Sequence, residues 1–273
     1  MASNRIRRPT VAGYFYPREP DQLRQAVSQL MGISTQQTRN AQVTIVPHSS
    51  YQFSGAVAAA ALSAIHIPER WIVLGTNHTG VGSAWSVMPD GTYQTPLGDV
   101  PVDAALAEDL LARCPVLEAD EVAHGGEHAI EVPLPLLQWR RPTDLQIVPI
   151  ITKSEDPHTC RQVAQAVADL VRESAQPLTV LISSDLSHYE SHEAAVEKDA
   201  ALLQAVHAVD ANRFLCCVRE HSVRMCGTGA IACGLWIAAC LGVHDVTTIR
   251  YATSADAGGD PDSVTGFAGV LLN

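Results

Sequence analysis

The stretch from residue 178 to residue 189 constrains the fold more than any other part of the sequence. It opens with the apolar, β-branched run Leu-Thr-Val-Leu-Ile, which is typical of a buried strand. The run ends in two serines, which are followed by Asp185 and, three residues later, by His188. In open α/β sheets, ligands bind beyond the carboxyl ends of the strands. The pattern therefore predicts a strand that carries an acid and an imidazole to a binding site.

Two other apolar strands are followed by a histidine in the same way. Residues 43–46 form a short β-branched run shortly before His48, and residues 71–75 form another shortly before His78. An alanine-rich helix over residues 55–65 separates them, so the handedness of strand–helix–strand units predicts that the two strands are parallel. Parallel strands end at the same edge of a sheet, so we expect both histidines to converge with the acid and the imidazole described above.

The rest of the chain alternates between helical and strand patterns. Helical spacing or capping residues predict helices at about 21–30, 102–113, 156–172, 193–207, 210–219 and 226–242, and apolar runs predict strands at 146–151, 246–252 and 264–271. Residues 83–99 are typical of a hairpin or loop with its turn at residues 89–91. We therefore expect an α/β fold: a single domain over residues 1–273, with a mixed, largely parallel central sheet flanked by helices.

Composition and charge limit the partners. The chain has 273 residues and a formal net charge of −11, which repels phosphate backbones, so we expect no nucleic-acid partner. Its only basic cluster, Arg5 with Arg7 and Arg8, is expected to be a solvated tail. The apolar segment 225–243 is long enough to span a bilayer, but its glycines favour a buried core helix, so we expect no membrane partner.

The cysteines favour a reducing compartment. The seven cysteines include no Cys-x-x-Cys pair, and no apolar leader follows the N-terminal arginines, so we expect a cytoplasmic protein without structural disulfides. Cys226 differs from the others because it precedes Gly-Thr-Gly at the predicted start of a helix. The exposed amides at a helix start favour the thiolate, which is the form that binds metals and attacks substrates.

Together these residues predict a metal site. A first-row transition metal needs at least three protein ligands, and the imidazoles of His48 and His78 would provide two of them. A carboxylate in third place, such as that of Asp185, suits non-haem iron(II), whereas the thiolate of Cys226 suits zinc or copper. The residues alone leave both possibilities open.

Two other clusters also have more than one interpretation. His128 and Glu131 are three residues apart, so they either share one face of a helix or act as a capping pair. The aromatic residues 14–16 form either an anchor in the core or the wall of a pocket. The sequence contains no dinucleotide-binding fingerprint, no Walker motif and no Gly-x-Ser-x-Gly elbow, which argues against those enzyme classes.

A series of motifs occurs in an order that resembles the Memo family over nearly the whole chain. They are Ala12 to Pro17, Pro47-His48 with Tyr51, Gly75 with Asn77-His78, Glu127 to Glu131, Ser184-Asp185 with His188-Tyr189, Cys226-Gly227, and Gly259-Asp260 with Val264, Gly266 and Ala268. The resemblance implies a fold similar to that of class III extradiol dioxygenases, which are non-haem iron enzymes. The sequence departs from the family pattern after Pro47-His48, where Ser49 and Ser50 replace the usual Ala-Gly.

The resemblance also implies roles for the site residues. In Memo-like proteins two histidines and a cysteine build the metal pocket, which matches His48, His78 and Cys226, and an aspartate and a histidine line it, which matches Asp185 and His188. We expect His188 to act as a general acid or base or to orient dioxygen, and Asp185 to fix that imidazole or bind a metal-bound water. A second layer behind the ligands is expected from His128, Glu131, Tyr16 and Tyr51.

These inferences lead to one main hypothesis and two alternatives. The main one is an iron(II)-dependent, dioxygenase-like oxidoreductase that acts on a small organic substrate with dioxygen, with copper and zinc as alternative metals. Because a thiolate changes the electronics of iron, extradiol ring cleavage does not simply transfer. The alternatives are a non-catalytic module that binds a metal or a peptide, and a metal-independent hydrolase with Cys226 as nucleophile. Oligomer formation remains open.

Overall fold

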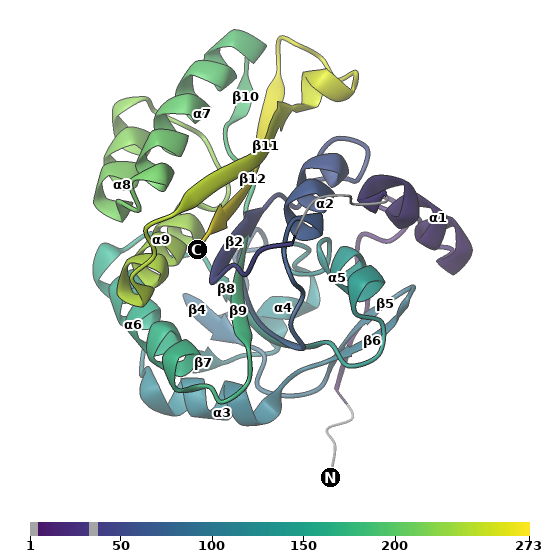
Figure 1. The fold of residues 1–273 in the computed structure, drawn as a ribbon, viewed down its shortest axis with the longest axis vertical. Helices are drawn as coiled ribbons and strands as arrows, with labels where there is room; N and C mark the ends of the chain where they lie inside the picture. Colours follow the sequence, from purple (N-terminus) through teal and green to yellow (C-terminus); the bar gives the residue numbers. More distant parts are fainter. Residues whose placement is uncertain (1–4, 33–37) are drawn as a thin grey trace.

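A mixed β-sheet runs through the centre of the computed structural model, which describes residues 5–32 and 38–273 (Figure 1). Its strands follow the order β10-β12-β2-β9-β3-β8-β4-β7, with β11 paired to the other side of β12. The strands are β2 (Val43–Val46), β3 (Arg70–Thr76), β4 (Trp85–Val87), β7 (Glu118–Ala119), β8 (Gln146–Thr152), β9 (Leu178–Ser183), β10 (His188–Glu190), β11 (Val246–Thr253) and β12 (Val264–Leu272). The sheet is parallel from β2 to β8 and antiparallel at β12 and β4, which confirms the predicted α/β fold.

The three strands that precede the predicted site residues are neighbours. Strand β9 lies between β2 and β3 and is parallel to both, so that Ile182 stands opposite Ile45 on one side and Leu74 on the other. The apolar runs of these strands are buried almost completely, as expected for the centre of a sheet that helices cover on both faces. Their carboxyl ends therefore meet at one edge, as the sequence predicted.

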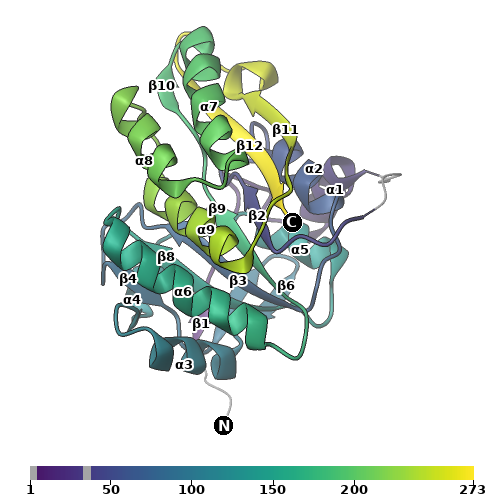
Figure 2. The same ribbon diagram turned by 60° about the vertical axis from the view of Figure 1, so that its left-hand side comes forward.

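Helices cover both faces of the sheet (Figure 2). On one face α9 packs against β2, β3, β8 and β9 with α6 beside it, and on the other face α2 packs against β2, β11 and β12, with α1 and α5 behind it. The helices are α1 (Pro20–Met31), α2 (Gly55–Ser63), α3 (Ala104–Arg113), α4 (Val122–Gly125), α5 (Leu134–Arg140), α6 (Pro157–Glu173), α7 (His192–His207), α8 (Ala211–Glu220), α9 (Thr228–Leu241) and the 3₁₀ turn η1 (Ser254–Ala257).

Helix α9 lies within the apolar segment 225–243, for which the sequence predicted a buried core helix and not a membrane span. Most of its residues are buried, including glycines and alanines that allow a close approach to the sheet, so the predicted core helix is confirmed. Among residues 5–32 and 38–273, no helix combines the length and the apolar character that crossing a bilayer demands.

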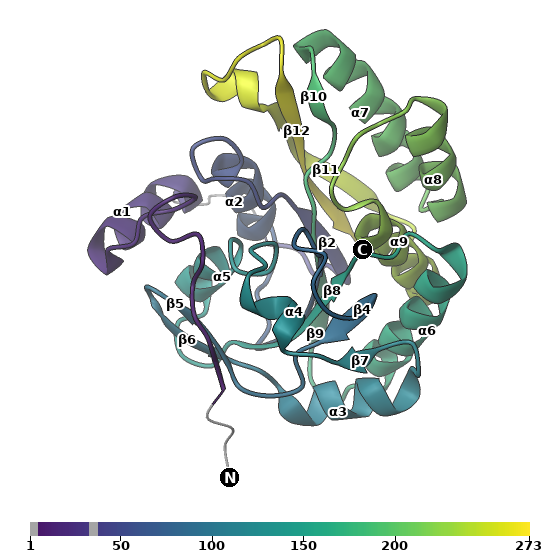
Figure 3. The same ribbon diagram turned by 180° about the vertical axis from the view of Figure 1, so that it is seen from behind.

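The N-terminal segment differs from its prediction. Strand β1 (Ile6–Arg7) pairs with β5 (Thr92–Thr95), which forms a hairpin with β6 (Gly98–Pro101), and the purple segment runs between β5 and α4 in Figure 3. The hairpin turns at residues 96–97, so the prediction of a turn at residues 89–91 is wrong: that segment connects β4 to β5, which belong to different sheets. Arg7 is buried and forms an ion pair with Glu131, so the prediction of a solvated basic tail is wrong for this residue. The distribution of charges along the sequence cannot show that a guanidinium will pair with a buried carboxylate from a distant part of the chain.

Candidate metal centre

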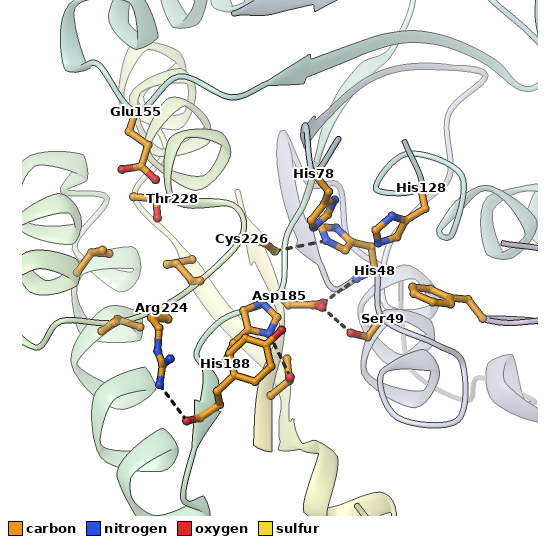
Figure 4. Close-up of a pocket in the computed structure, with 16 residues that line it drawn as sticks. His48, Ser49, His78, His128, Glu155, Asp185, His188, Arg224, Cys226 and Thr228 are labelled. Atoms are coloured by element: carbon orange, nitrogen blue, oxygen red, sulfur yellow. Dashed lines mark hydrogen bonds between the residues drawn. The ribbon is translucent and has the colours of Figure 1, made fainter. Parts of the chain in front are cut away.

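A pocket of about 660 Å³ opens where β2, β3 and β9 end (Figure 4). The polar side chains that line it include every residue predicted as a ligand or a catalytic group: His48, His78, Asp185, His188 and Cys226. Residues predicted from strand ends thus share one pocket with Cys226, which was predicted from a helix start and lies 178 positions from His48 in the chain. His128 and Phe15 complete the wall beside the imidazoles.

His48 follows β2, and a serine hydroxyl fixes one of its ring nitrogens. Its side chain is buried, and its Nδ1 lies 2.9 Å from the Oγ of Ser183, whose own hydroxyl donates to the carbonyl of Ala129 at 2.5 Å. Because the Ser183 proton is already used, Nδ1 of His48 must donate, and Nε2 keeps a free lone pair. Burial lowers the pKa of His48 to about 4, so the ring is neutral at neutral pH. This is the state in which imidazole binds a metal.

His78 follows β3 and is oriented by Glu127. The buried Glu127 carboxylate accepts hydrogen bonds from the backbone N–H of His78 at 2.5 Å and from its Nδ1 at 2.8 Å. Burial alone would raise the pKa of Glu127, but the hydrogen bonds from His78 and from the Ala129 amide outweigh it and lower the pKa to about 2. The ionised carboxylate can only accept, so Nδ1 of His78 donates and its Nε2 is left for the pocket.

Glu127 is the functional residue that the sequence reasoning missed. The sequence presents it only as part of a family motif, although it also accepts from the backbone N–H groups of His128 and Ala129. The available signal was an acid beside a histidine in a polar, glycine-containing segment. That signal does not reveal the partner, since His78 lies 49 residues earlier in the chain.

His128 lies in the pocket wall rather than behind it. Its ring stacks on His78 with centroids 4.4 Å apart and meets His48 edge-on at 5.5 Å. The ring of Phe15 packs edge-on against His128, with the two centroids 5.0 Å apart. Of the two interpretations of residues 14–16, an anchor in the core or a pocket wall, the second therefore holds for Phe15. Burial, and then the neighbouring His78, lower the pKa of His128 and favour the neutral ring.

Cys226 precedes the N-cap of α9 and faces His48. Its Sγ lies 3.4 Å from the Nε2 of His48, and its carbonyl accepts a hydrogen bond from Thr76 at the end of β3. Burial, followed by the charge of Asp185, raises the pKa of the thiol. This is the opposite of the thiolate expected at a helix start, because the cost of desolvating the charge exceeds the effect of the helix. A bound cation reverses this balance, since a coordinating thiol is deprotonated.

Asp185 is anchored by the turn that carries His48. It is buried, and its Oδ1 accepts from the backbone N–H of His48 at 2.9 Å while Oδ2 accepts from Ser49 Oγ at 2.6 Å. His188 is instead bonded through Nδ1 to Thr265 Oγ1 at 3.1 Å. Its Nε2 is buried and has no hydrogen-bond partner among the residues that the structure describes. Burial lowers the pKa of His188, which favours a neutral imidazole.

Comparison with known proteins identifies the family of the chain. A family model described as Memo-like protein matches residues 7–271. The chain belongs to the Memo family. A MEMO1 family protein of Methanopyrus kandleri is 36% identical over 278 residues, which cover 97% of this chain and 98% of the relative. Another MEMO1 family protein, of Pyrobaculum arsenaticum, is 36% identical over 280 residues, covering 98% and 99% respectively. The resemblance inferred from the motifs is thus confirmed.

The Memo fold also has a counterpart among solved structures. The crystal structure of an uncharacterized protein, JW3007, of Escherichia coli K12 superimposes with a TM-score of 0.57 and covers 85% of this chain and 100% of that chain. At 13% sequence identity, the likeness supports the architecture alone.

Within the part of this Memo protein that the structure describes, two groups of side chains are close enough to hold a metal ion. One is His48 with His78 and His128, and the other is His48 with Asp185 and Cys226; within each group the ligand atoms lie within 4.8 Å of one another. The three ligands expected from the family resemblance are thus divided between the groups, with His48 in both. Two imidazoles whose Nδ1 atoms are bonded to protein oxygens, together with a nearby thiol, are a donor set that suits iron, copper or zinc.

The remaining residues predicted for the second layer lie behind His128. Glu131 is fully buried and accepts from the Tyr16 hydroxyl at 2.5 Å as well as from Arg7. Tyr51 donates to the carbonyl of Val132 at 2.9 Å. These residues do not line the pocket but hold the segment after Glu127 in place, so their contribution to the site is indirect.

Proposed function

We propose that this Memo family protein binds a first-row transition metal, with iron as the first choice and copper or zinc as alternatives. His48, His78 and Cys226 would hold it. The observation that carries the proposal is the matched orientation of the two imidazoles. Each Nδ1 is bonded to an oxygen, from Ser183 or Glu127, so that each Nε2 can bind a metal, and the Nε2 of His48 already lies 3.4 Å from the proposed third ligand, Cys226 Sγ. Such second-layer contacts are what orient histidine ligands in metal sites.

We further propose that the site oxidises a small organic molecule with dioxygen. A bound redox-active metal would supply Lewis acidity and electron transfer at this position. The chain supplies a pocket of about 660 Å³, a volume in the usual range for small-molecule sites, with Val218, Val223 and Met225 as its apolar wall. A substrate bound against these side chains would have the histidines and Cys226 at its polar end.

His188 is the group best placed to move a proton. Thr265 fixes its Nδ1, so the ring cannot turn freely, and the unpartnered Nε2 is available to hold or accept a proton at the pocket. A neutral imidazole near physiological pH suits either role. Asp185 contributes by fixing the backbone of His48 rather than by contacting this ring.

Metal analysis tests the first part of the proposal. Protein purified without added metal should contain a near-stoichiometric ion, and anomalous scattering at the iron, copper and zinc edges should place it in the pocket. A His48→Ala/His78→Ala variant should lose that ion, whereas His158→Ala/His244→Ala, which removes two exposed imidazoles outside the pocket, should keep it. Equal metal content in all three proteins would refute the proposal. Oxygen uptake with candidate substrates then separates an oxidase from a module that only binds metal.

A metal-independent hydrolase is the second candidate, favoured by the distance of 3.4 Å between Cys226 Sγ and His48 Nε2. That geometry matches a nucleophile and its base. The raised pKa of the thiol and the lowered pKa of His48 argue against it, because both favour the neutral pair over thiolate and imidazolium. Hydrolytic activity that survives chelation and is abolished by iodoacetamide would support the hydrolase instead.

A further inference from the structure

Asp185 stands at the edge of the candidate metal centre with both carboxylate oxygens already engaged. Its ligand oxygen lies within 4.8 Å of the ligand atoms of His48 and Cys226, which is close enough to share an ion with them. Yet Oδ1 accepts from the His48 backbone N–H, and Oδ2 accepts from Ser49 Oγ at 2.6 Å (Figure 4). The second bond is short for a hydroxyl donor, as expected when the acceptor is charged.

Ser49 is held in place for this contact. Its carbonyl accepts a hydrogen bond from Ser54 Oγ at 2.8 Å, which ties the turn to the start of α2. Ser50 is the next residue of the same turn, but its side chain makes no hydrogen bond within the part of the chain that the structure describes; only its carbonyl is used, by Phe53 and Ser54. The two adjacent serines therefore differ in one respect that matters here, namely contact with Asp185.

We propose that Ser49 sets the number of protein ligands on the metal by holding the Asp185 carboxylate outside the ligand set. The inference rests on the proposed metal-binding function. In the wild type, one oxygen is bound by the hydroxyl and the other by the His48 amide, so the carboxylate is satisfied without the cation. Two imidazoles and the thiolate then leave positions on the ion open for a substrate.

Loss of the Ser49 hydroxyl leaves the Oδ2 atom of Asp185 without its hydrogen-bond donor. Asp185 is only 2% exposed, so an oxygen deprived of its hydrogen bond has little access to water. A buried charge without a partner is costly, and a cation a few ångströms away is the nearest substitute. The carboxylate should therefore turn to the ion and bind it in addition to the ligands already present, which raises the coordination number by one and adds one negative charge.

Cobalt(II) provides a direct probe, because its visible absorption bands are intense in four-coordinate sites and weak in five- or six-coordinate ones. We expect wild-type protein loaded with cobalt(II) to show the intense bands. Ser49→Ala should show markedly weaker bands and tighter cobalt binding, because an anionic oxygen ligand is added. Ser50→Ala, the same change one residue later, should match the wild type in both. Asp185→Asn should also keep the intense bands, since Asp185 is not a ligand in the wild type.

The double variant Ser49→Ala/Asp185→Asn identifies the new ligand. If the released carboxylate causes the change, this protein should regain the intense bands of the wild type, and circular dichroism should show all variants folded. An unchanged Ser49→Ala spectrum, an equal change in Ser50→Ala, or weak bands that persist in the double variant would each overturn the inference alone. Wild-type protein that binds no cobalt, or His48→Ala/His78→Ala protein that binds it equally well, would overturn the proposed function as well.

Discussion

Glu127 gathers four hydrogen bonds onto one buried carboxylate, and two of them come from His78. We predict that Glu127→Gln lowers metal affinity by roughly 10- to 100-fold, the usual effect of losing an outer partner of a histidine ligand. The amide offers one acceptor oxygen in place of two. With that oxygen at the position of Oε1, the NH2 group faces the backbone N–H of His78, so that hydrogen bond is lost and the turn that carries the ring is displaced. Chelator competition measures the affinity.

The matched control is Glu155→Gln. Glu155 also lines the pocket, but its side chain makes no hydrogen bond or ion pair within residues 5–32 and 38–273, so its replacement should leave the metal affinity unchanged. Equal affinities of Glu127→Gln and the wild type would show that the carboxylate supports the loop without orienting the ligand. Equal losses in both variants would point to the charge of the pocket instead.

At the level of single residues, the sequence predicted the groups at strand ends but not the groups that hold them. His48, His78 and Asp185 could be found because a general rule places ligands beyond parallel strands. Ser49 and Asp185 are 136 residues apart, and the contact depends on the shape of two turns, which no sequence period encodes. The direction of the Cys226 pKa shift was missed for a related reason, because burial at a helix start cannot be read from the helix pattern.

At the level of elements, long and strongly patterned segments were predictable and short ones were not. The strands at 43–46, 71–75 and 178–182 and the apolar helix near 226–242 correspond to β2, β3, β9 and α9. Strands β1 and β10 and helix α4 have two to four residues each. Such elements are held by partners from elsewhere in the fold, so their own residues carry little signal.

The packing of α9 on the sheet yields a prediction at this scale. A methyl group added at Gly234 would lie 2.6 Å from Cγ1 and 2.9 Å from Cδ1 of Ile182 in β9. Alanine is a better helix former than glycine by about 1 kcal/mol, but overpacking a core costs about 1–3 kcal/mol. We therefore expect Gly234→Ala to destabilise the protein by up to about 2 kcal/mol in urea unfolding.

A second substitution tests whether the clash is the cause. Ile182→Val removes Cδ1, so the double variant should lose less stability than the sum of the two single changes. Gly125→Ala adds a methyl group that meets nothing within 4 Å and should be neutral or slightly stabilising. Additive effects of Gly234→Ala and Ile182→Val would show that the methyl group does not press on the Cδ1 atom of this side chain.

At the scale of the whole molecule, one buried acid joins parts of the fold that lie far apart in the chain. Asp199 of α7 is fully buried, and it accepts hydrogen bonds from the Ser187 backbone N–H at 3.1 Å and from the Tyr251 hydroxyl at 2.9 Å. It thereby connects α7 to β11 and to the segment between Asp185 and His188. Burial raises the pKa of Asp199 to about 6, and the two hydrogen bonds only partly oppose this shift.

The raised pKa makes global stability depend on pH with a definite sign. Because the folded state binds this proton more tightly than the unfolded chain does, the contribution is fully present below the ordinary pKa of about 4 and is lost as pH rises through about 6. The side chain introduced by Asp199→Asn is neutral at every pH and can still accept from the Ser187 amide, so this variant should not show the loss. The stability of the variant relative to wild type should therefore rise by about 2–3 kcal/mol between pH 4 and pH 7.5. Urea unfolding of both proteins at several pH values gives the difference directly, and parallel curves would mean that Asp199 is already ionised in the folded protein at pH 4.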